Sequence, residues 1–233
     1  MYSLKNLLSA TLHLFYPHVC AGCGSDLLEN DTLLCLKCLN DLPYTYFAFH
    51  ENNPVEKIFR GRIAFSAAAA EFYFAKGSLI QSLVHQLKYK GNRKIGFYLG
   101  ELMGYHLLES KRFNDIDVLI PVPLYPDKER KRGYNQAAVI CEGLSSVMQV
   151  PVLNNNLIRQ RITDTQTRKH RPERWENVNG SFAIKEKDVI KDASVLLVDD
   201  VITTGATLEA CADVLKTVEN TRVYIAVLAQ ASK

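Results

Sequence analysis

The sequence predicts an α/β protein with a doubly wound, mainly parallel sheet and a small N-terminal zinc-binding module. Short apolar runs without polar alternation, such as 117–122 (DVLIPV) and 194–198 (SVLLV), are typical of strands buried on both faces. These runs alternate with stretches of helical periodicity, as expected of βαβ units in a parallel sheet. Two closely spaced C-x2-C pairs near the N-terminus predict the module.

The chain of 233 residues has room for one medium domain and one small module, and 47% hydrophobic with 23% charged residues is a globular composition. We expect a division near residue 50. Residues 1–50 hold an apolar helix and the cysteine pairs, and residues 51–233 form the α/β domain after the polar connector 51–54 (ENNP). The net charge of +3 says little about partners, but the basic residues gather in particular segments.

The elements of the domain follow from periodicity and turn signals. A strand is expected at 64–74, and a helix at 78–89 follows from the spacing of Leu79, Leu83, Val84 and Leu87. Further helices are expected at 95–108, 135–148 and 207–217, and further strands at 117–122, 153–158, 194–198 and 222–228. The polar, charged segment 159–177 is expected to be an exposed loop.

The N-terminal segment predicts a packed amphipathic helix rather than a membrane anchor or signal peptide. Leu4, Leu7, Leu8 and Leu12 recur at helical spacing, and no apolar run approaches the roughly 20 residues that span a bilayer. Nothing in the cysteine usage suggests an oxidising compartment, so we expect a cytoplasmic protein without a membrane span. Cys141 and Cys211 stand alone in apolar stretches and are expected to be buried thiols.

The four paired cysteines predict a structural zinc site. Cys20 and Cys23 form one C-x2-C pair, and Cys35 and Cys38 form the other, with eleven residues between the pairs. Each pair presents two sulfurs from one knuckle, and two knuckles complete the tetrahedral shell that Zn²⁺ prefers. Four thiolates leave no open position for chemistry, so the ion would act as a scaffold and supply folding energy. Two disulfides, a redox pair or an iron–sulfur cluster are the alternatives for this pattern.

The segment 195–207 (VLLVDDVITTGAT) predicts a site for a sugar phosphate. An apolar strand ends in Asp199 and Asp200, and a Thr/Gly-rich loop then leads into a helix. Ligands of open α/β sheets bind at this end of the strands, and a helix N-terminus favours an anion. The hydroxyls of Thr203, Thr204 and Thr207 add donors, whereas the two carboxylates suit sugar hydroxyls or Mg²⁺. An ordinary threonine cap would explain one of these threonines, but not the whole pattern.

The same stretch resembles the motif by which type I phosphoribosyltransferases bind phosphoribosyl pyrophosphate (PRPP). The resemblance implies that residues 203–207, including Gly205 and Ala206, hold the 5-phosphate, and that Asp199 and Asp200 contact the ribose hydroxyls. It also implies Mg²⁺ as the companion of PRPP. The sequence contains neither a Walker loop nor a G-x-G-x-x-G fingerprint, which argues against a P-loop NTPase or a Rossmann dehydrogenase.

Basic residues follow two other strands. The loop after strand 117–122 carries Lys128, Arg130, Lys131 and Arg132 and should lie on the same sheet edge as the phosphate loop. Pyrophosphate is its expected ligand, and a merely solvated loop is the alternative. The second segment contains Arg161, Arg168, Lys169, Arg171, Arg174 and Trp175. It fits a mobile loop that closes over PRPP, a surface for single-stranded nucleic acid, or a simple soluble loop.

Taken together, these motifs resemble the ComF family of competence proteins, also called GntX-like. The resemblance rests on the order of the N-terminal helix, the four cysteines, Leu87-Lys88-Tyr89, the segment 130–136 (RKRGYNQ) and the loop 199–207. It implies a zinc module fused to a phosphoribosyltransferase-type domain that handles single-stranded DNA during natural transformation, with an ATP-driven DNA translocase as partner.

Two classes of function remain open at this stage. The first is a binding protein for PRPP, or a related ribose phosphate, and single-stranded DNA. The second is an enzyme that transfers phosphoribose from PRPP to an unidentified base or amine. Such a transfer needs positioning and stabilisation of the departing pyrophosphate more than a catalytic side chain, so the sequence identifies no catalytic residue.

Overall fold

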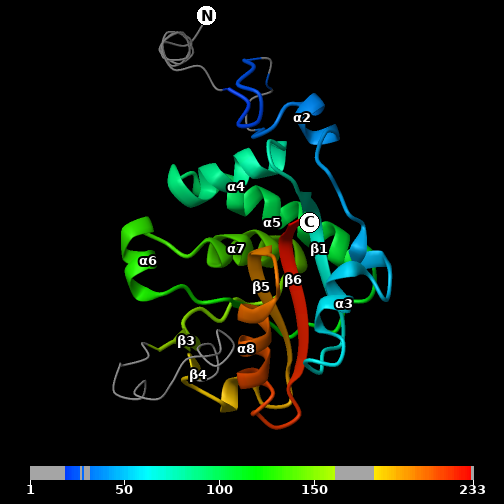
Figure 1. Cartoon of the computed structure of the whole chain (residues 1–233), viewed down its shortest axis with the longest axis vertical. Coiled ribbons are helices and arrows are strands. Elements are labelled where there is room, and N and C mark those ends of the chain that lie inside the picture. Colours follow the sequence, from blue (N-terminus) through cyan, green and yellow to red (C-terminus); the bar gives the residue numbers. More distant parts are fainter. Residues whose placement is uncertain (1–18, 27, 29–31, 161–180, 232–233) are drawn as a thin grey trace, which may run out of the picture.

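The apolar runs of the sequence form a parallel sheet in the computed structural model, which describes residues 19–26, 28, 32–160 and 181–231 (Figure 1). The described elements are α2 (Leu36–Asn40), η1 (Phe47–Phe49), α3 (Pro54–Phe59), β1 (Ala68–Phe74), α4 (Leu79–Tyr89), α5 (Arg93–Glu109), β2 (Val118–Pro121), α6 (Pro126–Arg132), α7 (Gln136–Met148), β3 (Leu157–Arg159), β4 (Phe182–Ile184), η3 (Asp188–Ile190), β5 (Ser194–Ile202), α8 (Ala206–Leu215) and β6 (Arg222–Ala231). The expected N-terminal helix lies outside the described residues.

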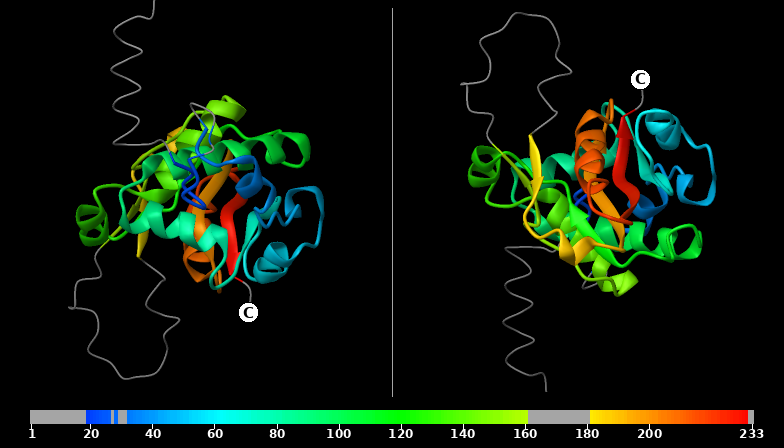
Figure 2. Two further views of the ribbon diagram at one scale, coloured as in Figure 1. Left: turned by 90° about the horizontal axis from the view of Figure 1, so that it is seen from above. Right: turned by 90° about the horizontal axis from the view of Figure 1, so that it is seen from below.

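The main sheet has the strand order β1-β6-β5-β2, and every neighbouring pair is parallel. Helices α5 and α7 cover one face and α8 lies on the other (Figure 2). Strand β2 is buried throughout, and residues 195–198 of β5 are fully buried. Because both faces are covered, neither strand alternates polar with apolar residues. The predicted fold class is confirmed.

Glycines set the distance between α5 and α7. A Cβ atom on Gly143 of α7 would lie 2.0 Å from the carbonyl oxygen of Phe97, and one on Gly100 of α5 would lie 2.3 Å from that of Ile140. The two backbones therefore approach closely enough to exclude any side chain. This contact fixes how closely the two helices pack on the sheet.

Two expected elements differ from the prediction. The segment after β2, expected as a loop, contains helix α6, which begins at Pro126 and ends before Gly133 in the left-handed conformation (φ 84°). The strand expected at 153–158 is interrupted by Asn155 at φ 63°. Only Val152 bridges to β2, and β3 pairs with β4 in a separate antiparallel ribbon.

The chain on either side of residue 50 is closely joined. The backbone N–H of Tyr73 in β1 donates to Pro43 (2.8 Å), and that of Thr45 donates to Glu71 (2.9 Å). Asn53 caps α3 and donates from Nδ2 to the carbonyl of Ala68 (2.8 Å). The division near residue 50 stays a prediction. Among the helices of the described ranges, none is long and apolar enough to cross a membrane.

The close approach of α5 and α7 predicts a specific sensitivity to one methyl group. We expect Gly143→Ala to lower the free energy of unfolding by about 3 kcal/mol, because its Cβ would overlap the α5 backbone. Gly96→Ala is the matched control, since its Cβ would meet only the tips of Leu87 (2.8 Å) and Val139 (3.0 Å), which can move. Urea denaturation measures both variants. Equal stability of Gly143→Ala and the wild type would contradict this account of the packing.

Candidate functional site

The threonine-rich loop forms a small hollow at the head of α8. Strand β5 runs past the expected end to Ile202, and Gly205 adopts a left-handed conformation (φ 79°) directly before α8. A Cβ atom on Gly205 would lie 2.8 Å from Ile58 and 2.9 Å from Phe59, so only glycine fits here. The loop and the first turn of α8 line a hollow of about 50 Å³. Because α8 has no side-chain cap at Gly205, its first N–H groups point to a place suited to an anion.

Arg62 supports this loop from the side of α3. Its Nη1 donates to the carbonyl oxygens of Thr204 (3.0 Å) and Ile58 (3.1 Å), and its guanidinium pairs with Glu209 of α8. Thr203 and Thr204 are exposed, so their hydroxyls are available to a ligand. The sequence offered no signal for Arg62, because the contact joins segments more than 140 residues apart.

The two acids of the motif lie side by side at the end of β5. The Oδ1 atom of Asp199 accepts a hydrogen bond from the backbone N–H of Asp200 (2.8 Å), and Oδ2 of Asp200 pairs with Nζ of Lys88 in α4 (2.8 Å). Burial, reinforced by the charge of Asp200, raises the pKa of Asp199 to about 7, although Lys88 and Arg159 act in the opposite direction. Asp199 therefore changes its charge near neutral pH.

Basic side chains line the same site. A cleft of about 210 Å³ joins Asp199, Asp200 and Thr207 to four cationic residues, namely Lys88, Lys128, Arg132 and Arg159. Of the basic residues predicted after β2, Lys128 and Arg132 thus line the cleft. Arg130 instead pairs with Asp127 in solvent (2.5 Å), and Lys131 lines a neighbouring cavity. Residues 161, 168, 169, 171, 174 and 175, predicted as a flexible loop or DNA surface, lie outside the described residues.

Two of these cations were not among the expected site residues. Lys88 comes from α4, and Arg159 ends β3 with its guanidinium 3.6 Å from the centroid of the Tyr125 ring. The Nε atom of Arg159 is buried and has no hydrogen-bond partner among the described residues. Arg159 begins the charged segment 159–177 and Lys88 belongs to the motif Leu87-Lys88-Tyr89, but spacing alone does not reveal which cations turn toward the acids.

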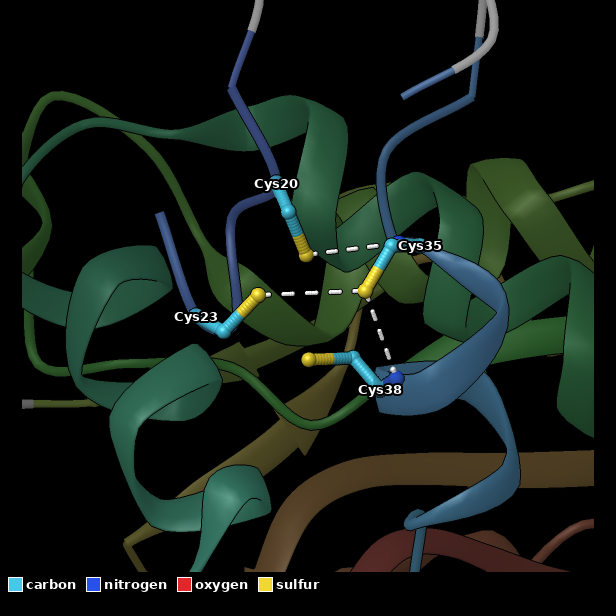
Figure 3. A group of neighbouring side chains, drawn as sticks. All are labelled: Cys20, Cys23, Cys35 and Cys38. Carbon is cyan, nitrogen blue, oxygen red and sulfur yellow. Dashed lines mark hydrogen bonds between the residues drawn. The ribbon is translucent and has the colours of Figure 1, made fainter. Parts of the chain in front are cut away.

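The four cysteines predicted to bind zinc form one cluster (Figure 3). All four thiols are free, and their sulfur atoms lie within 4.8 Å of one another. The sulfurs of Cys23 and Cys35 are 3.8 Å apart, which is about the edge of a tetrahedron with 2.3 Å metal–sulfur bonds. The arrangement is consistent with a structural zinc ion.

The backbone around the cluster favours thiolates. Burial alone would raise the pKa of Cys20, but N–H groups of Cys35, Cys23 and Gly22 lower it to about 6. Burial and the neighbouring sulfurs raise the pKa of Cys38. A bound cation would offset the repulsion between neighbouring thiolates, since it stabilises several thiolates at once.

Helix α4 contacts the segment of the first cysteine pair and also contributes Lys88 to the cleft. Leu79, the first residue of α4, lies 2.9 Å from where a Cβ of Gly22 would be, and further along the helix Nε2 of Gln86 donates to the carbonyl of Ala21 (2.9 Å). Near the C-terminal end of the helix Lys88 pairs with Asp200. The cluster and the cleft are therefore joined by one helix of 11 residues.

Known proteins resemble this chain in sequence. A family model described as a phosphoribosyl transferase domain matches residues 128–233. Competence protein F of Haemophilus influenzae is 32% identical over 153 residues, which cover 64% of this chain and 67% of that protein. The DNA utilization protein YhgH of Shigella flexneri is 29% identical over 139 residues, which cover 58% of this chain and only 60% of that protein. Among solved structures, the purine phosphoribosyltransferase of Pyrococcus horikoshii superposes over 57% of this chain and 74% of its own, with a TM-score of 0.37 and 20% identity, a likeness too low to bear on function.

The position of Asp199 predicts how stability depends on pH. An unfolded aspartate releases its proton near pH 4, whereas the folded protein holds the Asp199 proton up to about pH 7. The folded state therefore binds more protons in this window, and the contribution of Asp199 to stability falls as the pH rises through it. We expect Asp199→Asn to raise the free energy of unfolding at pH 8 by about 2 kcal/mol and to lose most of this advantage at pH 4.

Denaturant titrations of the zinc-loaded protein in magnesium-free buffer, without ligand, measure this difference at several pH values. The variant must be compared with the wild type because other groups also titrate. Burial raises the pKa of Glu71, and the hydrogen bond from His106 to Glu71 raises the pKa of His106. Asp41→Asn, at an exposed position directly after α2, is the control and should show no such trend. A constant difference between Asp199→Asn and the wild type from pH 4 to 8 would disprove the assignment.

Proposed function

The chain belongs to the ComF family, and from this premise we propose that it binds PRPP, or a closely related ribose phosphate, with Mg²⁺ in the cleft beside Asp199 and Asp200. We further propose that it serves DNA uptake during natural transformation by binding single-stranded DNA. The observation that carries the first proposal is that two acids, the first turn of α8 and four cations line one cleft.

Each part of PRPP has a chemical counterpart in this cleft. The 5-phosphate suits the hollow at residues 203–207, where backbone N–H groups and hydroxyls are the donors. The ribose hydroxyls and Mg²⁺ suit Asp199 and Asp200, because carboxylates accept hydrogen bonds and are hard oxygen ligands. The pyrophosphate suits Lys128, Arg132 and Arg159, and the unpartnered Nε of Arg159 supports an anionic ligand at that point.

We assign zinc to Cys20, Cys23, Cys35 and Cys38 as a structural ion. The sulfur separations and the N–H donors to Cys20 support this assignment. When bound, the ion would hold the two knuckles together and keep Gly22 against Leu79 on α4. It would have no open coordination position and therefore no catalytic part.

The DNA part of the proposal rests on the family and on charge. The names of the Haemophilus and Shigella relatives refer to competence and DNA utilization. Basic side chains border the cleft, and the six further residues predicted at 161–175 would add to them. An ATP-driven DNA translocase is the partner expected of a family member that handles incoming DNA.

The alternative function is phosphoribosyl transfer. In this reaction the bond from the ribose carbon to pyrophosphate breaks, and a bond to an acceptor nitrogen forms. The three cations assigned to the pyrophosphate favour this alternative, since they would stabilise the charge of the leaving group. The cleft alone does not specify the acceptor.

Calorimetry with Mg-PRPP tests the cleft. We expect Asp200→Ala to weaken binding about tenfold or more, because the acid no longer holds the ribose or the metal. Zinc content should not change, and Asp115→Ala, an exposed carboxylate just before β2, should bind as the wild type does. Equal affinity of Asp200→Ala and wild type would refute the role of this acid. Pyrophosphate release with a purine, pyrimidine, amine or ammonia added would favour the enzyme over the binding protein.

Elemental analysis tests the zinc assignment. We expect about one zinc per chain, and Cys38→Ser should lower zinc content and thermal stability together, because metal binding supplies folding energy to the module. Cys141→Ser is the control, since this thiol is buried in α7 away from the cluster and should leave the zinc content unchanged. A folded, metal-free wild type with four free thiols would rule out the assignment.

A further inference from the structure

We propose that a second cavity, beside the cleft, binds one nucleotide unit of single-stranded DNA, with the base stacked on Tyr89 and the phosphates held by the lysines and arginine around it. The inference rests on the proposed DNA-binding function and names the site for it. It differs from the surface predicted at 161–175, since it uses α4, the turn after it and α6.

The cavity has the charge and size for this ligand. It measures about 430 Å³ and is lined by Lys88, Tyr89, Gly91, Lys128, Lys131 and Arg132. Four of the six lining residues carry a positive charge and none is acidic. A volume of this order lies within the range of about 300–1,000 Å³ found for small-ligand sites. A ligand with closely spaced negative charges is therefore expected.

Helix α6 concentrates its positive charge toward this cavity. Lys128, Lys131 and Arg132 are three and four residues apart, so they share one helix face. The acids of α6 are engaged elsewhere. Asp127 pairs with Arg130, and Glu129 lines a different cavity together with Arg93. The cationic face is thus separated from the acids of the same helix.

Tyr89 identifies the ligand as a single strand. It is the last residue of α4, and 68% of its surface is exposed although its ring is largely apolar. The guanidinium of Arg132 lies 5.5 Å from the ring centroid, and the His85 ring lies 4.8 Å from it. An exposed aromatic ring beside cations is the combination by which proteins stack unpaired bases and neutralise their phosphates. Duplex DNA keeps its bases paired and offers no free face to such a ring.

The cavity and the sugar-phosphate cleft share side chains. Lys88, Lys128 and Arg132 line both. A PRPP molecule in the cleft would occupy these cations and place its own negative charge beside the DNA phosphates, and like charges brought together weaken binding. PRPP and single-stranded DNA should therefore bind antagonistically, each lowering the affinity of the other by the same factor.

Fluorescence anisotropy with a labelled oligodeoxythymidylate tests the site in the full zinc-loaded chain. We expect Tyr89→Ala to weaken binding about tenfold, whereas Tyr89→Phe keeps the ring and should stay near wild type. Tyr105→Ala removes an equally exposed tyrosine from α5 and should have no effect. Saturating Mg-PRPP should weaken the binding of the oligonucleotide to the wild type.

Two lysine variants distinguish binding at this site from nonspecific attraction between the oligonucleotide and any positive charge. Lys131 lines the cavity but not the cleft. We expect Lys131→Gln to weaken oligonucleotide binding and to reduce the salt dependence of that binding by about one phosphate contact. The affinity for Mg-PRPP should not change. Lys57→Gln, an exposed lysine on α3, is the matched control.

The outcomes distinguish this inference from the proposed function. If the wild type binds the oligonucleotide but Tyr89→Ala and Lys131→Gln bind it equally well, the site is wrong while the DNA-binding function stands. If the wild type does not bind it at low salt, both fail. If Lys131→Gln weakens the binding of an acidic peptide and Tyr89→Ala changes neither peptide nor oligonucleotide binding, the cavity binds an acidic protein partner. That result also overturns the inference. If Mg-PRPP does not weaken oligonucleotide binding, the claim that both ligands use the same cations is refuted.

Discussion

The parallel pairing of β2 and β5 is the constraint on which the site depends. Pro121 of β2 lies opposite Val198 of β5, and both strands run in the same direction. The segments that follow these residues must therefore leave the sheet at the same edge. One of them carries Asp199, Asp200 and the threonine loop, and the other carries α6. Residues almost 70 positions apart in the sequence are brought together without any contact between them being needed to guide the fold.

The Lys88–Asp200 ion pair shows how this edge tolerates two adjacent acids. A half-buried pair of carboxylates is unfavourable, because burial disfavours each charge and the two repel each other. Two features of the structure reduce this cost. Lys88 neutralises Asp200 at 2.8 Å, and Asp199 has a pKa near 7, so it can hold a proton at neutral pH. A divalent cation would supply the same relief, and Lys88 therefore stands where a bound Mg²⁺ would compete with it for Asp200.

The sequence was most informative where one local rule decided the structure. Strands β2 and β5 follow from apolar runs, and Ser78 caps α4 where the periodicity begins. The turn from β5 into α8 follows from Gly205, which takes the left-handed conformation directly before the helix. Pro126 and Gly133 are start and stop signals that would have revealed α6, had its charged residues not suggested a loop. Asn155, with its left-handed backbone, explains why the strand expected at 153–158 is interrupted.

Contacts between distant segments could not be predicted in the same way. Arg62 is an ordinary surface arginine until α3 places it against Thr204 and Glu209. Lys131 and Arg132 are neighbours in the same basic run and both line the second cavity, but only Arg132 also lines the cleft. Charge in a segment is visible in the sequence, whereas its direction depends on helix phase and on the neighbouring elements.

Helix α4 links the cysteine cluster to the chemistry of the cleft through its geometry. Gln86 and Lys88 are two residues apart, so they point to different sides of the helix, one toward Ala21 and the other toward Asp200. Helix α4 is held in the core by Ile80, Leu83, Val84 and Leu87, which are buried. A metal ion in the four-cysteine cluster would make the contacts of Ala21 and Gly22 with this helix more rigid. The module is therefore best understood as a part of the cleft's framework rather than as a separate attachment.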